Sequence, residues 1–296
     1  MLRRILLASA GAVAVLGAAR AAEPLPLPTP PPPIWTGFYA GANAGYTFGG
    51  SNDVDLLTGS VFFALSPDAV PVFGDSADQS GTRVLSANNS GFIGGGQAGY
   101  NYQFANLWVA GVETDIQGAG ARASSRATGI VPDPAESAIA GFPVSAVSSL
   151  SAADAVDYLG TVRGRLGFLV TPSLLIFAGA GFAYGGVHQD ISVSTTFPPT
   201  PLGLASAFGG FTNTRPGWTA SGGLEWMFMP NWSAKLEYLY YDLGTTIFAA
   251  GVQTLSFTPL FPSILTELTT ARTRWNGSIA RAGLNYHFNW GAPPER

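Results

Sequence analysis

The most regular feature of this sequence is a set of segments in which apolar residues alternate with small or polar ones. In the first segment, one face would carry Phe38, Ala40, Ala42, Ala44, Tyr46 and Phe48, and the other Tyr39, Gly41, Asn43, Gly45 and Thr47. Further segments begin near Phe92, Trp108, Tyr158, Leu174, Trp218, Trp232 and Ala282. A period of two residues is that of a β-strand, so the pattern predicts about eight strands.

Short and long connections alternate between these segments. The short ones, at Ala105-Asn106, Thr171-Pro172 and Met229-Pro230-Asn231, contain residues that favour tight turns. The long ones span about residues 49–90, 119–155, 188–215 and 245–272, and we expect them to be loops. Short turns on one rim and long loops on the other are typical of outer-membrane barrels, whose turns are periplasmic and whose loops lie outside. An even number of strands would place both chain termini in the periplasm.

The composition favours a surface that faces lipid. Only 11% of the 296 residues are charged, 12% are aromatic, and the mean hydropathy is +0.24. A soluble domain carries about 25% charged residues. The best candidate for a spanning helix beyond the N-terminus, residues 166–182, is interrupted at Thr171-Pro172-Ser173. We therefore predict an all-β, transmembrane, antiparallel up-and-down barrel, and the alternation disfavours a soluble Gly-rich β-sandwich.

The tryptophans give a further indication of a membrane. They lie near the ends of the predicted strands, at Trp35, Trp108, Trp218, Trp226, Trp232, Trp275 and Trp290. Indole rings prefer the interface between membrane and water, so we expect two aromatic girdles.

The regions outside the barrel have distinct compositions. Residues 1–21 combine Arg3 and Arg4, an apolar stretch and a small-residue cleavage site, so we predict a signal peptide cut after Ala21. Residues 22–34 form a Pro-rich periplasmic linker, residues 35–290 the barrel and residues 291–296 a C-terminal tail. The absence of cysteine excludes disulfides and a lipoprotein anchor. Removing the three signal arginines leaves 11 basic and 18 acidic residues, a net charge of −7, which argues against nucleic acid as a partner.

Several charged residues fall on the predicted inward face. They are Glu113, Asp115, Glu225 and Glu237 among the acids, and Arg163, Arg165, Lys235 and Arg281 among the bases. An eight-stranded interior is just wide enough for side chains to fill, and buried charges must be paired. We therefore expect a charge-compensated plug, and a gated pore or a carboxylate site is the alternative.

The sequence predicts no catalytic, cofactor-binding or metal-binding residues. His188 with nearby Asp190, at the start of a predicted loop, is a weak candidate for catalysis at the barrel rim, and His287 is predicted to point inward. Gly94, Gly96 and Gly99 match a GxGxxG pattern, but a dinucleotide loop needs a following helix and these glycines lie within an alternating strand.

Three segments resemble the outer-membrane immunogenic proteins of alphaproteobacteria, which are relatives of the eight-stranded OmpA and OmpX barrels. They are WTGFYAGANAGY at 35–46, NWSAKLEYLYYDLG at 231–244 and RAGLNYHF at 281–288. The resemblance implies a bacterial outer-membrane location, with membrane lipid and lipopolysaccharide as partners. It also implies an assembly signal in Gly283, Tyr286 and Phe288, read by the barrel-assembly machinery, although residues 289–296 follow where such signals usually end.

The resemblance also implies a function. We expect a structural, surface-exposed barrel that contributes to envelope integrity and surface interactions. A passive small-solute channel is the main alternative, and an enzyme at the rim is a third. The sequence predicts no oligomeric state.

Overall fold

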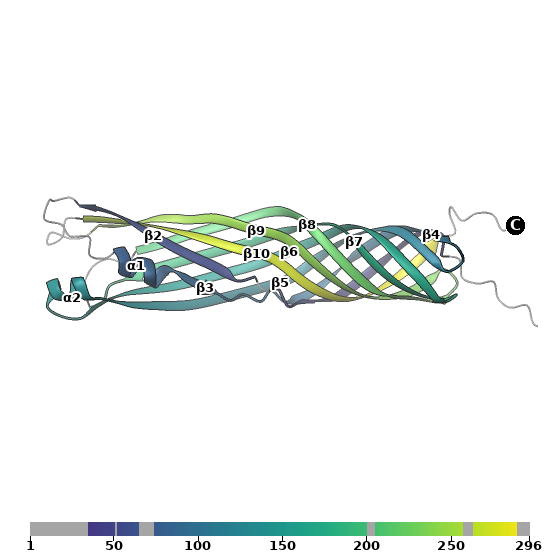
Figure 1. Cartoon of the computed structure of the whole chain (residues 1–296), viewed down its shortest axis with the longest axis horizontal. Helices are drawn as coiled ribbons and strands as arrows, with labels where there is room; N and C mark the ends of the chain where they lie inside the picture. Colours follow the sequence, from purple (N-terminus) through teal and green to yellow (C-terminus); the bar gives the residue numbers. More distant parts are fainter. Residues whose placement is uncertain (1–34, 51, 65–73, 200–204, 257–262, 289–296) are drawn as a thin grey trace, which may run out of the picture. The chain divides into compact units, whose positions relative to one another are not determined.

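The computed structural model describes residues 35–50, 52–64, 74–199, 205–256 and 263–288 (Figure 1). The chain divides into two units, Met1–Pro32 and Pro33–Arg296, and the account below concerns the second. The predicted signal peptide, linker and C-terminal tail, together with Trp290, lie outside the described residues.

Within the described ranges, the chain forms ten strands and two short helices. In chain order they are β1 (Gly37–Phe48), β2 (Val54–Ala64), α1 (Gly74–Gly81), β3 (Arg83–Leu85), β4 (Gly91–Phe104), β5 (Trp108–Asp133), α2 (Pro134–Ala140), β6 (Val144–Thr171), β7 (Leu174–Thr196), β8 (Ala205–Met229), β9 (Trp232–Ser256) and β10 (Ser263–Phe288). Neither helix has the length and apolar character needed to cross a membrane.

Eight of the strands close into an antiparallel ring, which confirms the predicted barrel. The order is β1-β4-β5-β6-β7-β8-β9-β10, and β10 returns to pair with β1 from Phe38↔Phe288 to Phe48↔Ser278. Beyond the end of β1, β2 pairs with the other half of β10, and β3 pairs with β2. The predicted tight turns fall between β4 and β5, β6 and β7, and β8 and β9, where Ala105, Asn106 and Asn231 adopt positive φ.

The outward face of the ring carries a charge-free apolar band. We call the following residues the membrane-spanning segments: 38–48, 92–104, 108–118, 158–170, 174–186, 218–228, 232–240 and 280–288. Their outward positions are apolar, aromatic, small or Thr, and several large side chains, such as Val112 and Leu236, are more than half exposed. Each segment is close to the length of about 9–11 residues that spans a bilayer as a tilted strand.

Two of the predicted girdle tryptophans are in fact inside the barrel. Trp108, Trp218, Trp226 and Trp232 are 39–53% exposed, as expected for an interfacial position, but Trp35 and Trp275 are fully buried. Trp35 precedes β1, and its Nε1 donates to the carbonyl oxygen of Pro172 (3.0 Å). Trp275 lies in β10, where the odd positions face inward on both sides of it, as Thr273 and Arg281 do.

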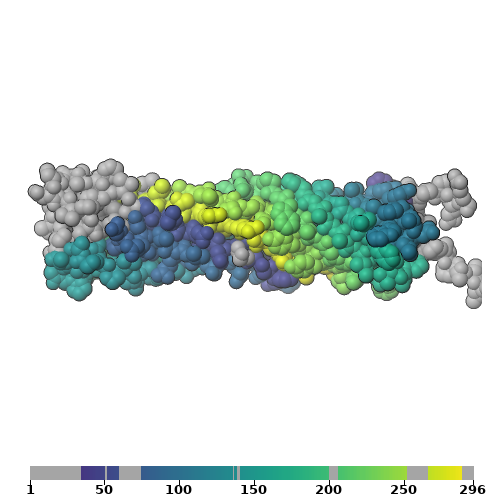
Figure 2. Space-filling model, viewed as in Figure 1, coloured from purple at the N-terminus to yellow at the C-terminus, as the bar shows by residue number. Residues whose placement is uncertain are grey.

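The prediction of four long loops is wrong, because most of that sequence is strand. β5 and β6 stay paired to Asp133↔Val144, β7 and β8 to Thr195↔Ala205, and β9 and β10 to Ile264↔Ser256. The first connection holds β2, α1 and β3 instead. We call the described residues of 54–85, 119–156, 187–216 and 243–274 the extension. In Figure 2, the blue surface of the first of these ranges lies directly against yellow β10.

The extension has an apolar core in place of a lumen. A buried cluster joins side chains from β2, β3, β6, β7, β9 and β10: Val54, Leu56, Leu85, Leu150, Ala152, Ile191, Val193, Ala250 and Ala271. Two of the strands around it, β8 and β9, approach closely at Gly209. A Cβ atom there would lie 2.7 Å from the Cα atom of Ala250. Burial of apolar surface stabilises the folded state by about 25 cal/mol per Å². This inward packing accounts for ordered strands outside the membrane.

β8 and β9 stop pairing with each other at the base of the extension. Their ladder ends at Trp218↔Asp242. Beyond it, the Asp242 carboxylate accepts a hydrogen bond from the Gly244 amide (2.8 Å), and Gly244 has a φ of +79° that disfavours other residues. Arg215 of β8 then reaches across and donates to the Thr245 carbonyl (3.0 Å), so a side chain replaces the missing ladder.

Helix α1 packs inside the extension. Ala77 and Ser80 are fully buried, and the helix contacts β2, β5 and β6. Ser80 shares a hydrogen bond with Ser148 (2.7 Å), and Ser76 donates to Asp133 (2.8 Å). These bonds join the segment between β1 and β4 to the wall of the barrel.

One buried carboxyl group in the extension makes stability depend on pH. Asp154 of β6 is 2% exposed, faces its cross-strand neighbour Gln189 and forms no ion pair among the described residues. Burial raises the pKa of Asp154 to about 6, although Gln189 acts in the opposite direction. Because the folded state holds the proton more tightly than the unfolded state, the cost of ionisation is absent below about pH 4 and complete above about pH 6.

We therefore predict that Asp154→Asn stabilises the protein at about pH 8 and not at about pH 3.5. The expected gain at the higher pH is at most ~3 kcal/mol, since each unit of pKa shift corresponds to about 1.4 kcal/mol. The urea midpoint of circular dichroism at the two pH values measures it. Asp157→Asn is the control, because Asp157 is exposed on the same strand. An Asp154→Asn variant with no gain at pH 8 would contradict the prediction.

Candidate functional site

The strand register places opposite charges side by side within the membrane-spanning segments. Glu113 of β5 is the cross-strand partner of Arg163 of β6, and Glu237 of β9 is the partner of Arg281 of β10. Glu225 of β8 lies opposite Lys235 of β9 in the same way. Cross-strand partners have Cβ atoms about 5 Å apart. The strand register alone therefore makes these oppositely charged inward side chains neighbours.

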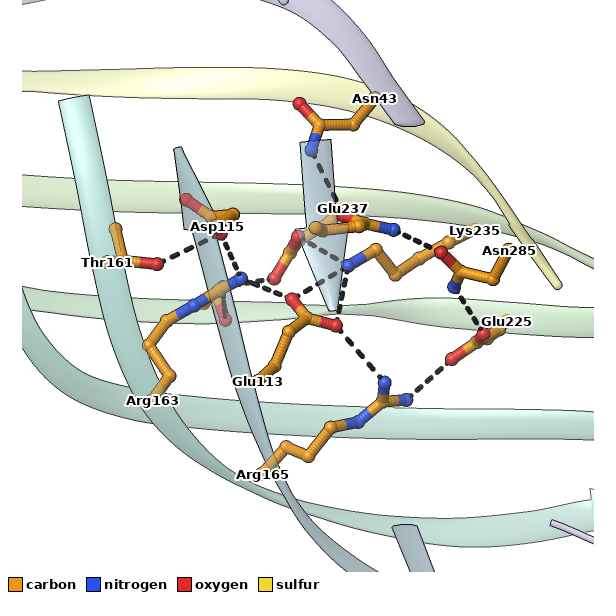
Figure 3. Close-up of polar contacts among 12 residues, drawn as sticks. Asn43, Glu113, Asp115, Thr161, Arg163, Arg165, Glu225, Lys235, Glu237 and Asn285 are labelled. Carbon is orange, nitrogen blue, oxygen red and sulfur yellow. Dashed lines mark hydrogen bonds and ion pairs between the residues drawn. The ribbon is translucent and has the colours of Figure 1, made fainter. Parts of the chain in front are cut away.

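Ion pairs then cross the lumen from one wall to the other (Figure 3). Lys235 Nζ lies 2.8 Å from Glu113 Oε1, and Arg281 Nη2 lies 2.8 Å from Asp115 Oδ2. The other crossing contacts pair Arg165 with Glu225 (2.7 Å) and Arg163 with Glu237. All eight side chains are at most 3% exposed. The structure thus brings together every inward charge that the sequence predicted, and we call this set the charged layer.

Glu113 is at the centre of the charged layer. Its carboxylate accepts hydrogen bonds from Arg163 (2.5 Å), from Lys235 (2.8 and 2.9 Å) and from the Tyr39 hydroxyl (2.7 Å). Arg165 adds a longer contact of 3.4 Å. Glu113 therefore links β1, β5, β6 and β9, and its charge compensates three cations in part.

A chain of amides extends the charged layer to β1, β4 and β10. Asn43 donates to Gln97 (3.1 Å), Gln97 donates to Asn285 (2.5 Å), and Asn285 donates to Glu225 (2.7 Å). The sequence places these residues on the inward face but assigns them no role. The strand register shows why these amides meet. Gly41 of β1 pairs with both Gln97 of β4 and Asn285 of β10, and Asn43 pairs with Gly283, two residues before Asn285.

Apolar layers close the lumen on both sides of the charged layer. At the end with the tight turns, a buried cluster contains Trp35, Val109, Leu169, Leu175, Phe177 and Met227. On the other side, a larger cluster contains Ile93, Ala121, Val156, Leu159, Ala183, Val187, Leu239, Tyr241, Leu243, Trp275 and Ile279. The guanidinium carbon of Arg165 lies 4.4 Å from the centre of the Phe177 ring, so the first cluster also covers the charges directly.

The two histidines occupy different environments. His188 lies on the outer surface of β7, with Nε2 2.9 Å from Asp190 and Nδ1 2.6 Å from Thr212. Both His188 and Asp190 are well exposed, at 41% and 62%, and His188 and Thr212 are simple cross-strand partners. His287 of β10 points inward as predicted, and it is buried beside Ser233 (2.9 Å) within the packed lumen.

The GxGxxG glycines lie in β4 and have a packing role. A Cβ atom at Gly99 would lie 2.5 Å from the Tyr39 hydroxyl oxygen, so this glycine leaves the space that Tyr39 needs to reach Glu113. Gly94 and Gly96 are on the outward face of the same strand. Gly99 therefore serves the charged layer, whereas Cβ atoms at Gly94 and Gly96 would make only ordinary contacts, and the pattern has no helix after it to bind a phosphate group.

Comparisons with known proteins agree with this architecture. The family described as "Outer membrane protein beta-barrel domain" matches residues 6–288. The 31 kDa outer-membrane immunogenic protein of Brucella melitensis biotype 1 is 32% identical over 257 residues, which cover 86% of this chain and 84% of that protein. The protein of the same name from Brucella suis biovar 1 matches to the same extent.

Solved structures show more distant similarity. The outer membrane protein OprG from Pseudomonas aeruginosa is 15% identical, with 86% of this chain and 99% of that chain covered and a TM-score of 0.34. Neisserial surface protein A is 14% identical, with 86% and 98% covered and a TM-score of 0.28.

We predict that Glu113→Gln strongly destabilises the barrel. The change keeps the shape of the side chain but leaves Lys235 and Arg163 without their shared anion, and breaking a buried ion pair on one side costs about 3–5 kcal/mol. The urea midpoint for loss of the folded, heat-modifiable form in electrophoresis measures it. Asp190→Asn is the control, because that carboxylate is exposed. Equal midpoints for Glu113→Gln and wild type would show that the charged layer does not stabilise the barrel.

Proposed function

Because the chain belongs to the outer membrane protein β-barrel family, we propose that it is a closed structural anchor that presents the extension at the cell surface. Its resemblance to the outer-membrane immunogenic proteins is confirmed by the 32% identity. The observation that carries the proposal is the charged layer, which spans the lumen from wall to wall between two apolar clusters.

The charge balance of the lumen supports a plug rather than a pore. Four carboxylates meet four cationic side chains, and every one of the eight takes part in at least one ion pair within 4 Å. An open channel would need these groups to be hydrated, and here they are nearly inaccessible to solvent. Since an eight-stranded interior is just filled by side chains, little space is left for a water path.

A structural role also explains the outer surface better than catalysis does. His188, Asp190 and Thr212 are hydrogen-bonded, but water reaches both charged groups, and a catalytic triad relies on a partly enclosed base and an oxyanion hole. His287 and Ser233 are enclosed in the lumen, where a substrate has no access. We infer that the protein is not an enzyme.

Lipid, lipopolysaccharide and the barrel-assembly machinery are the partners that this proposal includes. The charge-free band supplies the surface for lipid and for the acyl chains of lipopolysaccharide. For the assembly machinery, Tyr286 and Phe288 of β10 point outward, and the Tyr286 ring contacts both Trp232 (5.2 Å between centres) and Phe288 (5.1 Å). Gly283 lies on the inward side of the same strand, near Gln97.

The proposed orientation places both termini in the periplasm and the extension outside. The tight turns and the last residue of β10 lie at the same end of the ring, and β5 and β6 extend from the other end to α2. Periplasmic turns are short in this class of protein, which supports the assignment.

We predict that the wild-type protein gives no unitary conductance steps in planar lipid bilayers. The reason is that ion pairs cross the lumen between two buried apolar clusters and are nearly inaccessible to solvent. The double variant Glu113→Ala/Lys235→Ala removes one crossing pair without changing the net charge, and we expect it to stay silent because both apolar clusters remain. An open porin reconstituted in the same bilayers is the positive control. Reproducible steps from the wild type would favour the small-solute channel instead.

We also predict that an epitope tag inserted after Gly141 is accessible to antibody on intact cells. Gly141 follows α2 at an exposed turn with φ +74°, so an insertion there leaves the strand ladders intact. The same tag placed after Arg296 should be detected only after permeabilisation. Detection of the C-terminal tag on intact cells would reverse the proposed orientation.

A further inference from the structure

Two acidic side chains lie on elements that contact each other inside the extension, Glu267 on β10 and Asp78 on α1. Glu267 of β10 is 1% exposed, and neither of its carboxylate oxygens has a hydrogen bond of ordinary length. Asp78 of α1 lies close enough to repel it, and the buried Oδ1 of Asp78 is also without a partner. Among the described residues, no Lys, Arg or His nitrogen lies within 4 Å of either group, in contrast to the charged layer.

Several buried hydroxyl groups lie on the same elements and on the neighbouring strands. Ser80, Ser148 and Thr195 form a hydrogen-bonded chain (2.7 and 2.9 Å), and Thr195 lies next to Glu267. Thr269, two residues from Glu267 on the same inward face of β10, is 3.1 Å from the Thr58 hydroxyl of β2. All five hydroxyl-bearing residues are at most 4% exposed. The polar atoms on these side chains are all oxygen, and hard cations prefer oxygen ligands.

The burial of Glu267 favours compensation of its charge, by a proton or by a cation. Burial, and after it the charge of Asp78, raise the pKa of Glu267 to about 7, while Thr195 acts in the opposite direction. A carboxylate enclosed without compensation is costly. A single proton would neutralise one of the two groups and leave the other charge in place, whereas one divalent ion balances both. Ca²⁺ accepts six to eight oxygen ligands in flexible geometry, and Mg²⁺ demands a near-ideal octahedron and keeps its waters.

We propose that Glu267 and Asp78, together with the surrounding Ser and Thr hydroxyls, bind a calcium ion that fastens α1 to β10 inside the extension. The site goes beyond the anchoring role proposed above and does not depend on it. Its consequence is structural: α1 belongs to the connection between β1 and β4, so a bound ion joins this inserted segment to the strand that closes the ring. An affinity of about 0.1–1 mM, typical of extracellular calcium modules, would keep such a site filled outside the cell.

Two measurements on the full chain, refolded in detergent micelles and freed of metal with a chelator, test the proposal. Titration calorimetry with CaCl₂ at about pH 8, which is above the raised pKa of Glu267, should show one site. Hydrogen exchange with mass spectrometry should show that about 5 mM Ca²⁺ slows exchange in α1 by roughly tenfold, since binding to the folded form opposes local opening. An unchanged exchange rate together with no calorimetric binding would overturn the proposal and leave protonation as the compensation.

Matched variants identify the residues responsible. Glu267→Gln and Asp78→Asn keep the shape of each side chain and should both abolish the calcium response, and the partly exposed Asp78 provides a second variant if Glu267→Gln folds poorly. Asp154→Asn is the control, because it removes another buried carboxyl of the extension that has no second acid beside it, and it should respond as wild type does. A full calcium response in Asp78→Asn or Glu267→Gln would place the ion elsewhere and refute the site.

Discussion

Inside a closed ring of eight strands, a charge has to meet an opposite charge, because neither lipid nor bulk water can compensate it. This constraint organises the membrane-spanning half of the molecule. Glu113 and Asp115 project from one wall, Lys235 and Arg281 from the opposite wall, and their side chains meet across the lumen. Small residues such as Gly99 and Gly111 then become necessary, since a Cβ atom there would contact Tyr39 or Asn101. The positions of these glycines, of the amide chain and of Tyr39 all follow from the charged layer that they accommodate.

Outside the membrane, the same strands must place apolar side chains inside and polar side chains on the surface. In the membrane-spanning segment of β6, Val162, Leu166 and Phe168 point outward, and the polar positions point inward. In the extension, Leu150 and Ala152 point inward, and Ser149 and Ala153 face solvent. A register shift between Val156 and Tyr158 marks the boundary, where the inward positions of β6 change from even numbers in the extension to odd numbers in the membrane-spanning segment. A one-residue bulge is the simplest device for this change, since each added residue turns every later side chain to the other face.

This reversal explains how far the sequence predicts the structure. The eight alternating segments and the inward charges are predicted correctly, because apolar-out, polar-in alternation is specific for a barrel in lipid. In the extension the sequence favours loops instead, because Ala, Ser and Thr alternate there with only modest apolar residues and the phase changes at a bulge. The predicted place of Trp275 is wrong for another reason: its odd position puts it in phase with the inward Arg281, Asn285 and His287 of the same strand, but a tryptophan near a strand end suggests the membrane interface. The hydrogen bonds of Tyr39 and Gln97 need the register between β1 and β4, which no single segment reveals.

The two halves also differ in how they balance charge. The charged layer is neutral as a whole, with each acid facing a base that the chain itself supplies. Among the described residues, Asp154, Glu267 and Asp78 of the extension have no such base beside them, so protons or ions from the surroundings would have to balance their charge. A barrel wall in lipid has no access to an external ion, whereas the extension stands in water. The barrel thus balances its buried charges with contacts fixed in the sequence, whereas the extension, which its apolar core holds together, leaves the balance of its buried charges to the medium.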